Sequence, residues 1–398
     1  MDEPICDPDH VALEQEPERW DRLCAGLKWR LALARRERAA APQLAVELAE
    51  APEAERLAMI RSRPELRTPA VCDLLLDQSF AQGFPDPTRA IDLAGLAVQI
   101  AEQLDPGFYG RSVVQDLRTR AWAHLGNARR LASDFIGAEQ ALAVAESHQE
   151  QGSADPLEEA RVLDFKASLL SDRGQLDQAL ELLDRVIEIY KEIHDTHRQG
   201  RTLIGKGLIL GYAGRPEEGV ALISDGLARI DRDREPRLEL MAHHNLAWLL
   251  NDCGRSAEAR DLLEGFRGAY REFPDVWTGI RLIWLESRIA LGLGWWEEAE
   301  TGLRDARERF LAQGTDYEAS MVTLDLAFLY LQKGRTAEVK QLAREMLPLF
   351  FSQDIHRHAL AALAAFQQAV ETDRVTPHLI REVAAYLSRA QHNPNLRF

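Results

Sequence analysis

The feature that most constrains this chain is a glycine that recurs every forty residues. The five glycines in this register are Gly174, Gly214, Gly254, Gly294 and Gly334. Seven positions before each one stands a small residue, in order Ala167, Gly207, Ala247, Ser287 and Ala327. Five positions after each one come Ala179, Gly219, Ala259, Ala299 and Val339. The frame extends one unit earlier through Gly126, Ser133 and Ala138, so six similar units follow one another.

Each unit has helical periodicity on both sides of its glycine. Around Gly254, for example, apolar residues recur at three and four positions from Leu246 to Phe266, which predicts two amphipathic helices joined by one turn. A helix ends well on a residue of positive φ, a conformation that costs a residue other than glycine about 1 kcal/mol. The small residues allow the two helix backbones to approach closely, and a bulky side chain there would cost roughly 1–3 kcal/mol.

A small residue, a turn glycine and an early alanine in the next helix together resemble the tetratricopeptide-repeat (TPR) family. The resemblance rests on Ala123 to Asn127 with Ala138 and Ala145, and on Gly294 to Glu300 with Ala306. The period is forty residues rather than the usual 34 or so, and Val186, Phe266 and Met346 replace the last small residue. The resemblance implies an all-α fold, a right-handed superhelical solenoid of antiparallel helix hairpins, of the bacterial type.

The sequences on either side of the repeat array lack its periodicity. Together with the array they divide the chain into four parts. We expect an N-terminal helical cap over residues 1–68, with helices over 17–40 and 43–61. A degenerate first repeat and a loop follow over 69–110, and six TPR-like repeats occupy 111–351. Capping helices and a tail follow over 352–398, with helices near 359–369 and 376–390 and the tail from residue 391. Such caps cover the apolar ends that a solenoid would otherwise expose.

Two adjacent tryptophans, Trp295 and Trp296, suggest at first a surface for stacking a ligand. They follow the turn glycine Gly294, so they occupy the position at which the second helix of a unit begins. We therefore expect them to be packed or partly exposed at a turn, with a contact surface as the alternative.

Composition excludes several classes of partner. The net charge is −16, which repels phosphate backbones and anionic lipids, so direct nucleic-acid or membrane binding is not expected. The start of the chain lacks the apolar core of a secretory signal. The four cysteines, Cys6, Cys24, Cys72 and Cys253, are widely separated, which favours reduced thiols over disulfides or a zinc site. We expect a cytoplasmic protein.

The residues most suited to binding a partner lie on the first helix of each unit, which lines the concave face in TPR proteins. Arginine recurs there at one position of an acidic protein: Arg120, Arg161, Arg201 and Arg281. Arginine binds carboxylates through two parallel hydrogen bonds, so the pattern predicts a peptide or protein with acidic residues or a free C-terminus. Polar and aromatic candidates on the same predicted face are Asn127, Arg130, His244, Trp248, Trp284, Arg288 and Phe328. The alternatives are ion pairs with acidic neighbours for the arginines and interhelical packing for the aromatic residues.

No motif for catalysis, metal binding or a cofactor stands out, so we expect no enzyme and no cofactor. The sequence favours a non-enzymatic scaffold or adaptor that holds a partner segment in its concave groove. A first alternative resembles bacterial TPR sensors, in which binding of a signalling peptide acts on an N-terminal helical module. That module would be the basic stretch with Arg19, Arg22, Lys28, Arg30, Arg35, Arg36 and Arg38. A second alternative is a self-assembling solenoid. The sequence leaves the partner's identity and the oligomeric state open.

Overall fold

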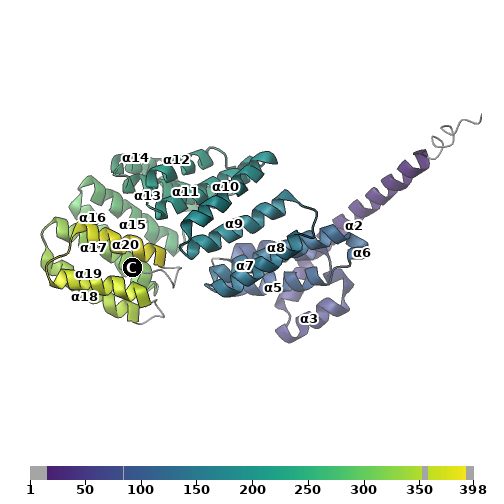
Figure 1. Cartoon of the computed structure of the whole chain (residues 1–398), viewed down its shortest axis with the longest axis horizontal. Coiled ribbons are helices and arrows are strands. Elements are labelled where there is room, and N and C mark those ends of the chain that lie inside the picture. Colours follow the sequence, from purple (N-terminus) through teal and green to yellow (C-terminus); the bar gives the residue numbers. More distant parts are fainter. Residues whose placement is uncertain (1–15, 84, 352–356, 391–398) are drawn as a thin grey trace, which may run out of the picture. The chain divides into compact units, whose positions relative to one another are not determined.

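The computed structural model describes residues 16–83, 85–351 and 357–390, and every regular element among them is a helix (Figure 1). The chain divides into two compact units, residues 1–158 and 159–398, and each is described by itself. The boundary falls within helix α9 (Pro156–Asp172). The tail from residue 391 and Cys6 lie outside the described residues, as do the side chains of Arg19 and Arg22.

The first unit is built from α2 to α8 and the short η1. Its elements are α2 (Glu16–Glu50), α3 (Glu53–Ser62), η1 (Pro64–Leu66), α4 (Pro69–Gln82), α5 (Pro87–Glu102), α6 (Pro106–Tyr109), α7 (Arg111–Leu131) and α8 (Phe135–Gln149). The core of this unit brings together buried residues of α2, α4, α5 and α7, including Leu48, Leu75, Ile100 and Leu117. The hairpin of α4 and α5 occupies the place of the expected degenerate repeat.

One helix boundary in this unit differs from the expectation. The predicted helices over 17–40 and 43–61 are wrong in their division, because α2 is continuous through Pro42 and the chain breaks at Pro52 instead. A proline removes one backbone donor and clashes with the preceding turn, yet a long helix can absorb this when its neighbours stabilise it. Ala41 and Ala45 are buried on either side of Pro42, and this packing holds the helix together.

The second unit continues the repeat from α9 to α18 and ends with two more helices. Its elements after α9 are α10 (Leu176–Glu192), α11 (Thr196–Tyr212), α12 (Pro216–Leu227), α13 (Pro236–Asp252), α14 (Ser256–Phe266), η2 (Arg267–Glu272), α15 (Val276–Leu293), α16 (Trp296–Ala312), α17 (Asp316–Gln332), α18 (Thr336–Phe351), α19 (Arg357–Glu371) and α20 (Pro377–Ala390). Successive helices pack as antiparallel neighbours along the chain. The odd-numbered helices α11, α13, α15 and α17 are the first helices of their hairpins.

The turn glycines have the conformation that the repeat predicts. All five adopt positive φ, between 67° and 77°. Ser133, which occupies the glycine position of the earliest unit, also adopts a positive φ of 63°. Trp295 occupies the position before α16 and Trp296 is the first residue of this helix, and both side chains are partly exposed. The tryptophan pair therefore lies at a turn, as expected.

The small residues are the points at which helices approach one another most closely. In the hairpin of α11 and α12, a methyl group added at Gly207 would lie 2.8 Å from the carbonyl oxygen of Gly219. One added at Gly226 would lie 2.6 Å from the carbonyl oxygen of Gly200. These distances leave no room for a side chain, so the hairpin packs backbone against backbone.

The last two helices reverse the order of the preceding hairpins. α19 packs against α18, whereas α20 packs against α17, a first helix, and also reaches α11. α20 contributes the buried Ile380, Val383, Tyr386 and Leu387 to a core shared with α17. The last helix therefore joins the layer of first helices (Figure 1).

Candidate functional site

The candidate residues of the second unit repeat at three positions of the first helices. Counted back from the turn glycine, these positions are 13, 10 and 6. They carry Arg161, Arg201 and Arg281 at the first position, His244 and Trp284 at the second, and Trp248, Arg288 and Phe328 at the third. Intervals of three and four residues place side chains on one face of a helix. We call this face of α9, α11, α13, α15 and α17 the inner face.

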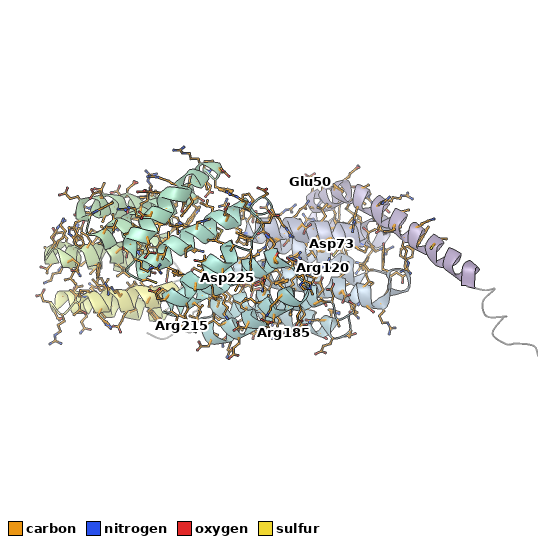
Figure 2. All side chains as sticks on the ribbon, turned by 90° about the horizontal axis from the view of Figure 1, so that it is seen from above. Glu50, Asp73, Arg120, Arg185, Arg215 and Asp225 are labelled. Atoms are coloured by element: carbon orange, nitrogen blue, oxygen red, sulfur yellow. The ribbon has the colours of Figure 1, made fainter. Side chains whose placement is uncertain are left out.

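The candidates of the first unit are engaged with other side chains. Arg120 donates from Nη1 to Asp73 at 2.6 Å and from Nε to Glu158 at 2.9 Å (Figure 2). Glu158 is buried, so Arg120 neutralises a carboxylate that would be costly to bury alone. Asn127, also buried, accepts hydrogen bonds from Arg130 at 3.0 and 3.1 Å. Arg120 thus makes the ion pairs with acidic neighbours that the sequence analysis gave as the alternative to binding a partner.

Two arginines of the inner face lie near the buried Tyr190. Burial raises the pKa of Tyr190 to about 12, and Arg161, Arg198 and Arg201 act in the opposite direction. Arg201 also pairs with Glu235 at 3.3 Å, and Glu235 contacts His197 at the same distance. This part of the inner face is positive but already contains a carboxylate.

The centre of the inner face is a cluster of two aromatic rings, from α13 and α15, with charged side chains of α13, α15 and α17. The rings of Trp248 and Trp284 meet edge to face with centroids 4.8 Å apart. Arg288 lies over the Trp248 ring at 4.2 Å and pairs with Asp252 at 3.1 Å. Trp284 donates from Nε1 to Asp325 at 2.7 Å. The structure thus brings together Trp248, Trp284 and Arg288, one cluster of α13, α15 and α17.

The charges of this cluster are held in place by burial and pairing. Burial raises the pKa of Asp325, while Arg288 and the indole of Trp284 act to lower it. Arg288 is shared between Asp252 and Asp325, the latter at 3.5 Å. A guanidinium held by two carboxylates and an aromatic ring has little freedom to reorient, so Arg288 orders the cluster.

Beside the cluster, Arg281 makes no ion pair or hydrogen bond with any described residue. It is exposed on α15, and its charge acts on Tyr212 of α11 and on His244 of α13. Burial, with a further contribution from Arg281, lowers the pKa of His244 to about 3. His244 is therefore neutral near pH 7, and its Nδ1 lies 2.7 Å from the hydroxyl of Tyr270. Its ring is 6.2 Å from that of Trp248.

Phe328 lies at the far end of the inner face, under the last helix. Arg381 of α20 is positioned 5.0 Å from its ring centroid. Phe328 therefore packs with α20, which corresponds to the packing alternative for this residue.

Several residues of the site were not found from the sequence. Asp252, Asp325, Glu235 and Tyr270 all hold candidate side chains in place. Asp325 follows its neighbour Trp284 by 41 residues, close to one repeat period, and that spacing is the signal that could have revealed it. Tyr270 lies in an irregular segment after α14, where the repeat gives no register.

Other kinds of site were sought in the part of the chain that the structure describes. There, no group of three or more His, Cys, Asp or Glu residues could hold a metal ion. Among the same residues, no helix has the length and apolar character needed to cross a bilayer. The described cysteines, Cys24, Cys72 and Cys253, are free thiols.

Comparison with known proteins identifies the fold. No protein-family model and no curated protein sequence matches the chain. Among solved structures, it is similar to a Rap protein complexed with competence and sporulation factor, with a TM-score of 0.62 and 12% identity over 82% of this chain and 88% of that one. It is similar to the apo form of RapI, with a TM-score of 0.52 and 13% identity over 80% and 86%. It is also similar to aspartyl phosphate phosphatase F from Bacillus subtilis, with a TM-score of 0.53 and 13% identity over 93% and 90%.

At these identities the likeness concerns the fold. Together with the repeating hairpins, it confirms the predicted fold class: this chain is an all-α, TPR-like helical-repeat solenoid with the fold of the Rap proteins.

Proposed function

We propose that this protein is a non-enzymatic, peptide-binding TPR-like adaptor or scaffold that holds a partner segment on the inner face of its second unit. The segment lies across α11, α13 and α15. The observation that carries the proposal is Arg281, an exposed guanidinium without a partner among the described residues, next to the aromatic cluster of Trp248 and Trp284. Fixed aromatic rings beside a free arginine are the usual components of a strong contact surface.

The guanidinium of Arg281 determines which chemical group the partner has to present. A free guanidinium binds a carboxylate through two parallel hydrogen bonds, so the partner presents an acidic side chain or a free C-terminus. Arg161 and Arg201 extend the positive character of the same face, and His244 adds none because it is neutral near pH 7. The chain's net charge of −16 opposes an acidic partner at long range, so recognition depends on this local group. The widely separated cysteines, which favour reduced thiols over disulfides, favour action in the cytoplasm.

Not every arginine of the predicted track has this role in our proposal. Arg120 is held by two carboxylates, Arg130 by Asn127, and Arg288 by Asp252 and Asp325. We assign them to the positioning of other side chains. Phe328 under Arg381 belongs to the packing of α20.

The experiment is a binding screen of the labelled full-length protein on an array of short synthetic peptides with free C-termini. Arg281→Glu reverses the charge on the inner face. Arg309→Glu is the matched control, because Arg309 is also an exposed helical arginine but lies on α16, a second helix. The proposal predicts acidic binders that are lost with Arg281→Glu and kept with Arg309→Glu. Binders that respond equally to both variants would refute it.

The alternative function is a peptide-responsive regulator with an N-terminal output module. One observation favours it: the N-terminal half of α2 extends away from the other helices of the first unit (Figure 1) and exposes Trp29 and Leu31. Lys28, Arg30, Arg35, Arg36 and Arg38 on the same stretch are also exposed. The likeness to a Rap protein whose crystal structure holds competence and sporulation factor supports this alternative as well.

Small-angle scattering separates the two functions. A peptide selected on the array should compact a regulator measurably, whereas a scaffold should keep its radius of gyration. Reversing the charge of Arg35, Arg36 and Arg38 together should leave peptide affinity within about twofold in either case, since those residues belong to the other unit.

A further inference from the structure

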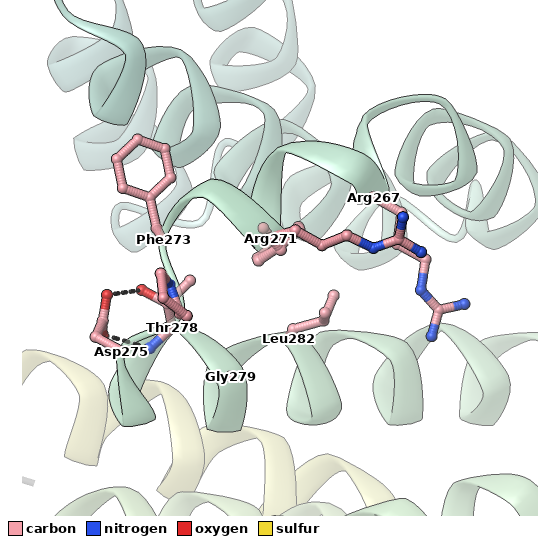
Figure 3. Close-up of a pocket in the computed structure, with 9 residues that line it drawn as sticks. Arg267, Arg271, Phe273, Asp275, Thr278, Gly279 and Leu282 are labelled. Atoms are coloured by element: carbon pink, nitrogen blue, oxygen red, sulfur yellow. Dashed lines mark hydrogen bonds between the residues drawn. The ribbon is translucent and has the colours of Figure 1, made fainter.

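A pocket lies at one end of the fourth hairpin of the array, where η2 leads into α15 (Figure 3). Its volume is about 250 Å³. The side chains that matter for its chemistry are Arg267, Tyr270, Arg271, Phe273, Asp275 and Leu282. None of them belongs to the inner face on which the proposed function rests.

The pocket lies next to one of the three units in which a larger residue replaces the last small residue. Twelve positions after the turn glycine, the preceding unit has Gly226, where the helices touch backbone to backbone. The fourth hairpin has Phe266 at this position, and its ring stacks on Tyr270 with centroids 5.7 Å apart. A side chain of that size does not fit where two helix backbones touch. The second helix ends at Phe266 and continues as the 3₁₀ segment η2, a tighter and less regular helix.

The charge balance of the pocket is positive. The carboxylate of Asp275 already has partners within the protein. It accepts hydrogen bonds from the backbone N–H of Thr278 at 2.9 Å and from the Thr278 hydroxyl at 2.8 Å. It also pairs with Arg237 at 3.2 Å, and these partners lower its pKa. Arg267 pairs with Glu286 at 2.9 Å. Arg271 is exposed and makes no ion pair or hydrogen bond with any described residue.

The remaining walls are apolar. Phe273, Pro274 and Leu282 line the pocket together with the ring of Tyr270. In Figure 3 the side chains of Arg267 and Arg271 extend toward the same end, beyond Leu282. A ligand that matches these walls has an apolar group with an anionic end.

We propose that this pocket is a second ligand site, which binds a carboxylate attached to an apolar side chain through Arg271, with Arg267 beside it. The volume is slightly below the usual range for drug-sized ligands and suits one amino-acid-sized group. Such a group is found at the free C-terminus of a peptide and in a small carboxylic acid. The two sources share the chemistry that the pocket recognises.

The site borders the inner face through one residue. Tyr270 lines the pocket with its ring and meets His244 with its hydroxyl at 2.7 Å. The experiment therefore has to distinguish binding in the pocket from binding on the inner face.

The test is a ligand-observed NMR titration of the full-length protein with N-acetylphenylalanine. N-acetylphenylalaninamide is the matched neutral probe, because it has the same ring and lacks the carboxylate. The acid should bind and the amide should not. Arg271→Gln should weaken binding of the acid by about tenfold or more, as expected for loss of a paired guanidinium. Arg309→Gln, an exposed arginine outside the pocket, should leave it unchanged.

The same titration separates this proposal from the proposed function. Arg281→Glu should leave binding of the acid intact if the acid occupies the pocket. Loss with Arg281→Glu but not with Arg271→Gln would move the acid to the inner face and overturn the pocket site. Equal binding of acid and amide, or no binding of the acid at millimolar concentration, would also overturn it. Arg271→Gln changes an exposed side chain, and an unchanged circular-dichroism melting curve verifies that the variant is folded.

A final pair of probes identifies the source of the carboxylate. The tripeptide Ala-Ala-Phe should bind more tightly than N-acetylphenylalanine if the pocket takes a peptide C-terminus, and its C-terminal amide should not bind. A tripeptide that binds more weakly than N-acetylphenylalanine would assign the pocket to a small carboxylic acid.

Discussion

Two glycines that stand two positions apart on α11 show how the repeat constrains single residues. Gly205 faces open space, whereas a methyl group at Gly207 would lie 2.6 Å from Cγ1 of Ile223 and 2.8 Å from the carbonyl of Gly219. The sequence distinguished them correctly, because only Gly207 stands seven positions before a turn glycine. A helical glycine without a packing role is a cost, and one between two backbones is a requirement.

We therefore expect opposite effects from the same substitution. Gly205→Ala should raise the free energy of unfolding by about 0.5–1 kcal/mol, since alanine is the better helix former. Gly207→Ala should lower it by about 1–3 kcal/mol, since the helices must separate. Urea unfolding of both variants measures the difference. A Gly207→Ala variant as stable as the wild type would show that the hairpin is not packed through its backbone.

His244 gives a second prediction at this scale. Burial lowers its pKa from the ordinary value of 6.5 to about 3 in the folded chain. Below about pH 6.5 the unfolded chain binds a proton that the folded chain excludes, so this residue makes stability fall as the pH falls from 6.5 toward 3. His244→Asn removes the titrating group and should flatten the stability profile in that window, measured by urea unfolding at several pH values. Above pH 7 the two profiles should run parallel. Profiles that remain parallel down to pH 4 would contradict the assignment.

At the scale of elements, the turns are the best-predicted feature and the pairings between helices the least. All five glycines have the expected positive φ, and Ser133 adopts it without being glycine. This agreement arises because a turn is decided by a few neighbouring residues. The contacts of Trp284 with Asp325 and of Phe328 with Arg381 depend on which helices become neighbours. No local sequence pattern predicts which helices these are.

Ser133 and Gly254 make the turn geometry testable in both directions. Ser133→Gly should stabilise the protein by about 0.5–1 kcal/mol, because it removes the steric cost of a left-handed backbone. Gly254→Ala introduces the same cost where nothing lies within 4 Å of the new methyl group, so it should destabilise by about 1 kcal/mol through conformation alone. Thermal unfolding followed by circular dichroism measures both. Equal effects of one sign would show that the turns are set by packing and not by φ.

The two ends of the array were harder to predict than its middle. The N-terminal helices were divided at Pro42, although α2 continues through it. The sequence predicts a cap for the last helix, α20, but not that this helix packs against α17 and α11. An amphipathic pattern shows that a helix has an apolar side, but the partner of that side is decided by contacts far apart in sequence. The pocket beside η2 has a related cause, because the repeat gives no register for the irregular segment that lines it.

At the scale of the whole molecule, the repeat establishes the fold and leaves the function to a small number of side chains. An acidic chain of net charge −16 places one unpaired guanidinium, Arg281, beside a fixed aromatic cluster on the inner face. Most of the other arginines that the sequence predicts to bind the partner are paired with Asp or Glu side chains of this chain. Composition and periodicity could locate the face, but which arginine is free depends on the neighbours that the fold supplies.

Hydrogen exchange on the full chain, with and without a peptide selected on the array, tests the central claim most directly. The account predicts slower exchange in α11, α13 and α15, which carry the inner face around Arg281. It predicts that Arg281→Glu abolishes this protection while Arg309→Glu preserves it. Protection confined to the first unit, or an effect that both variants share, would contradict a peptide-binding inner face.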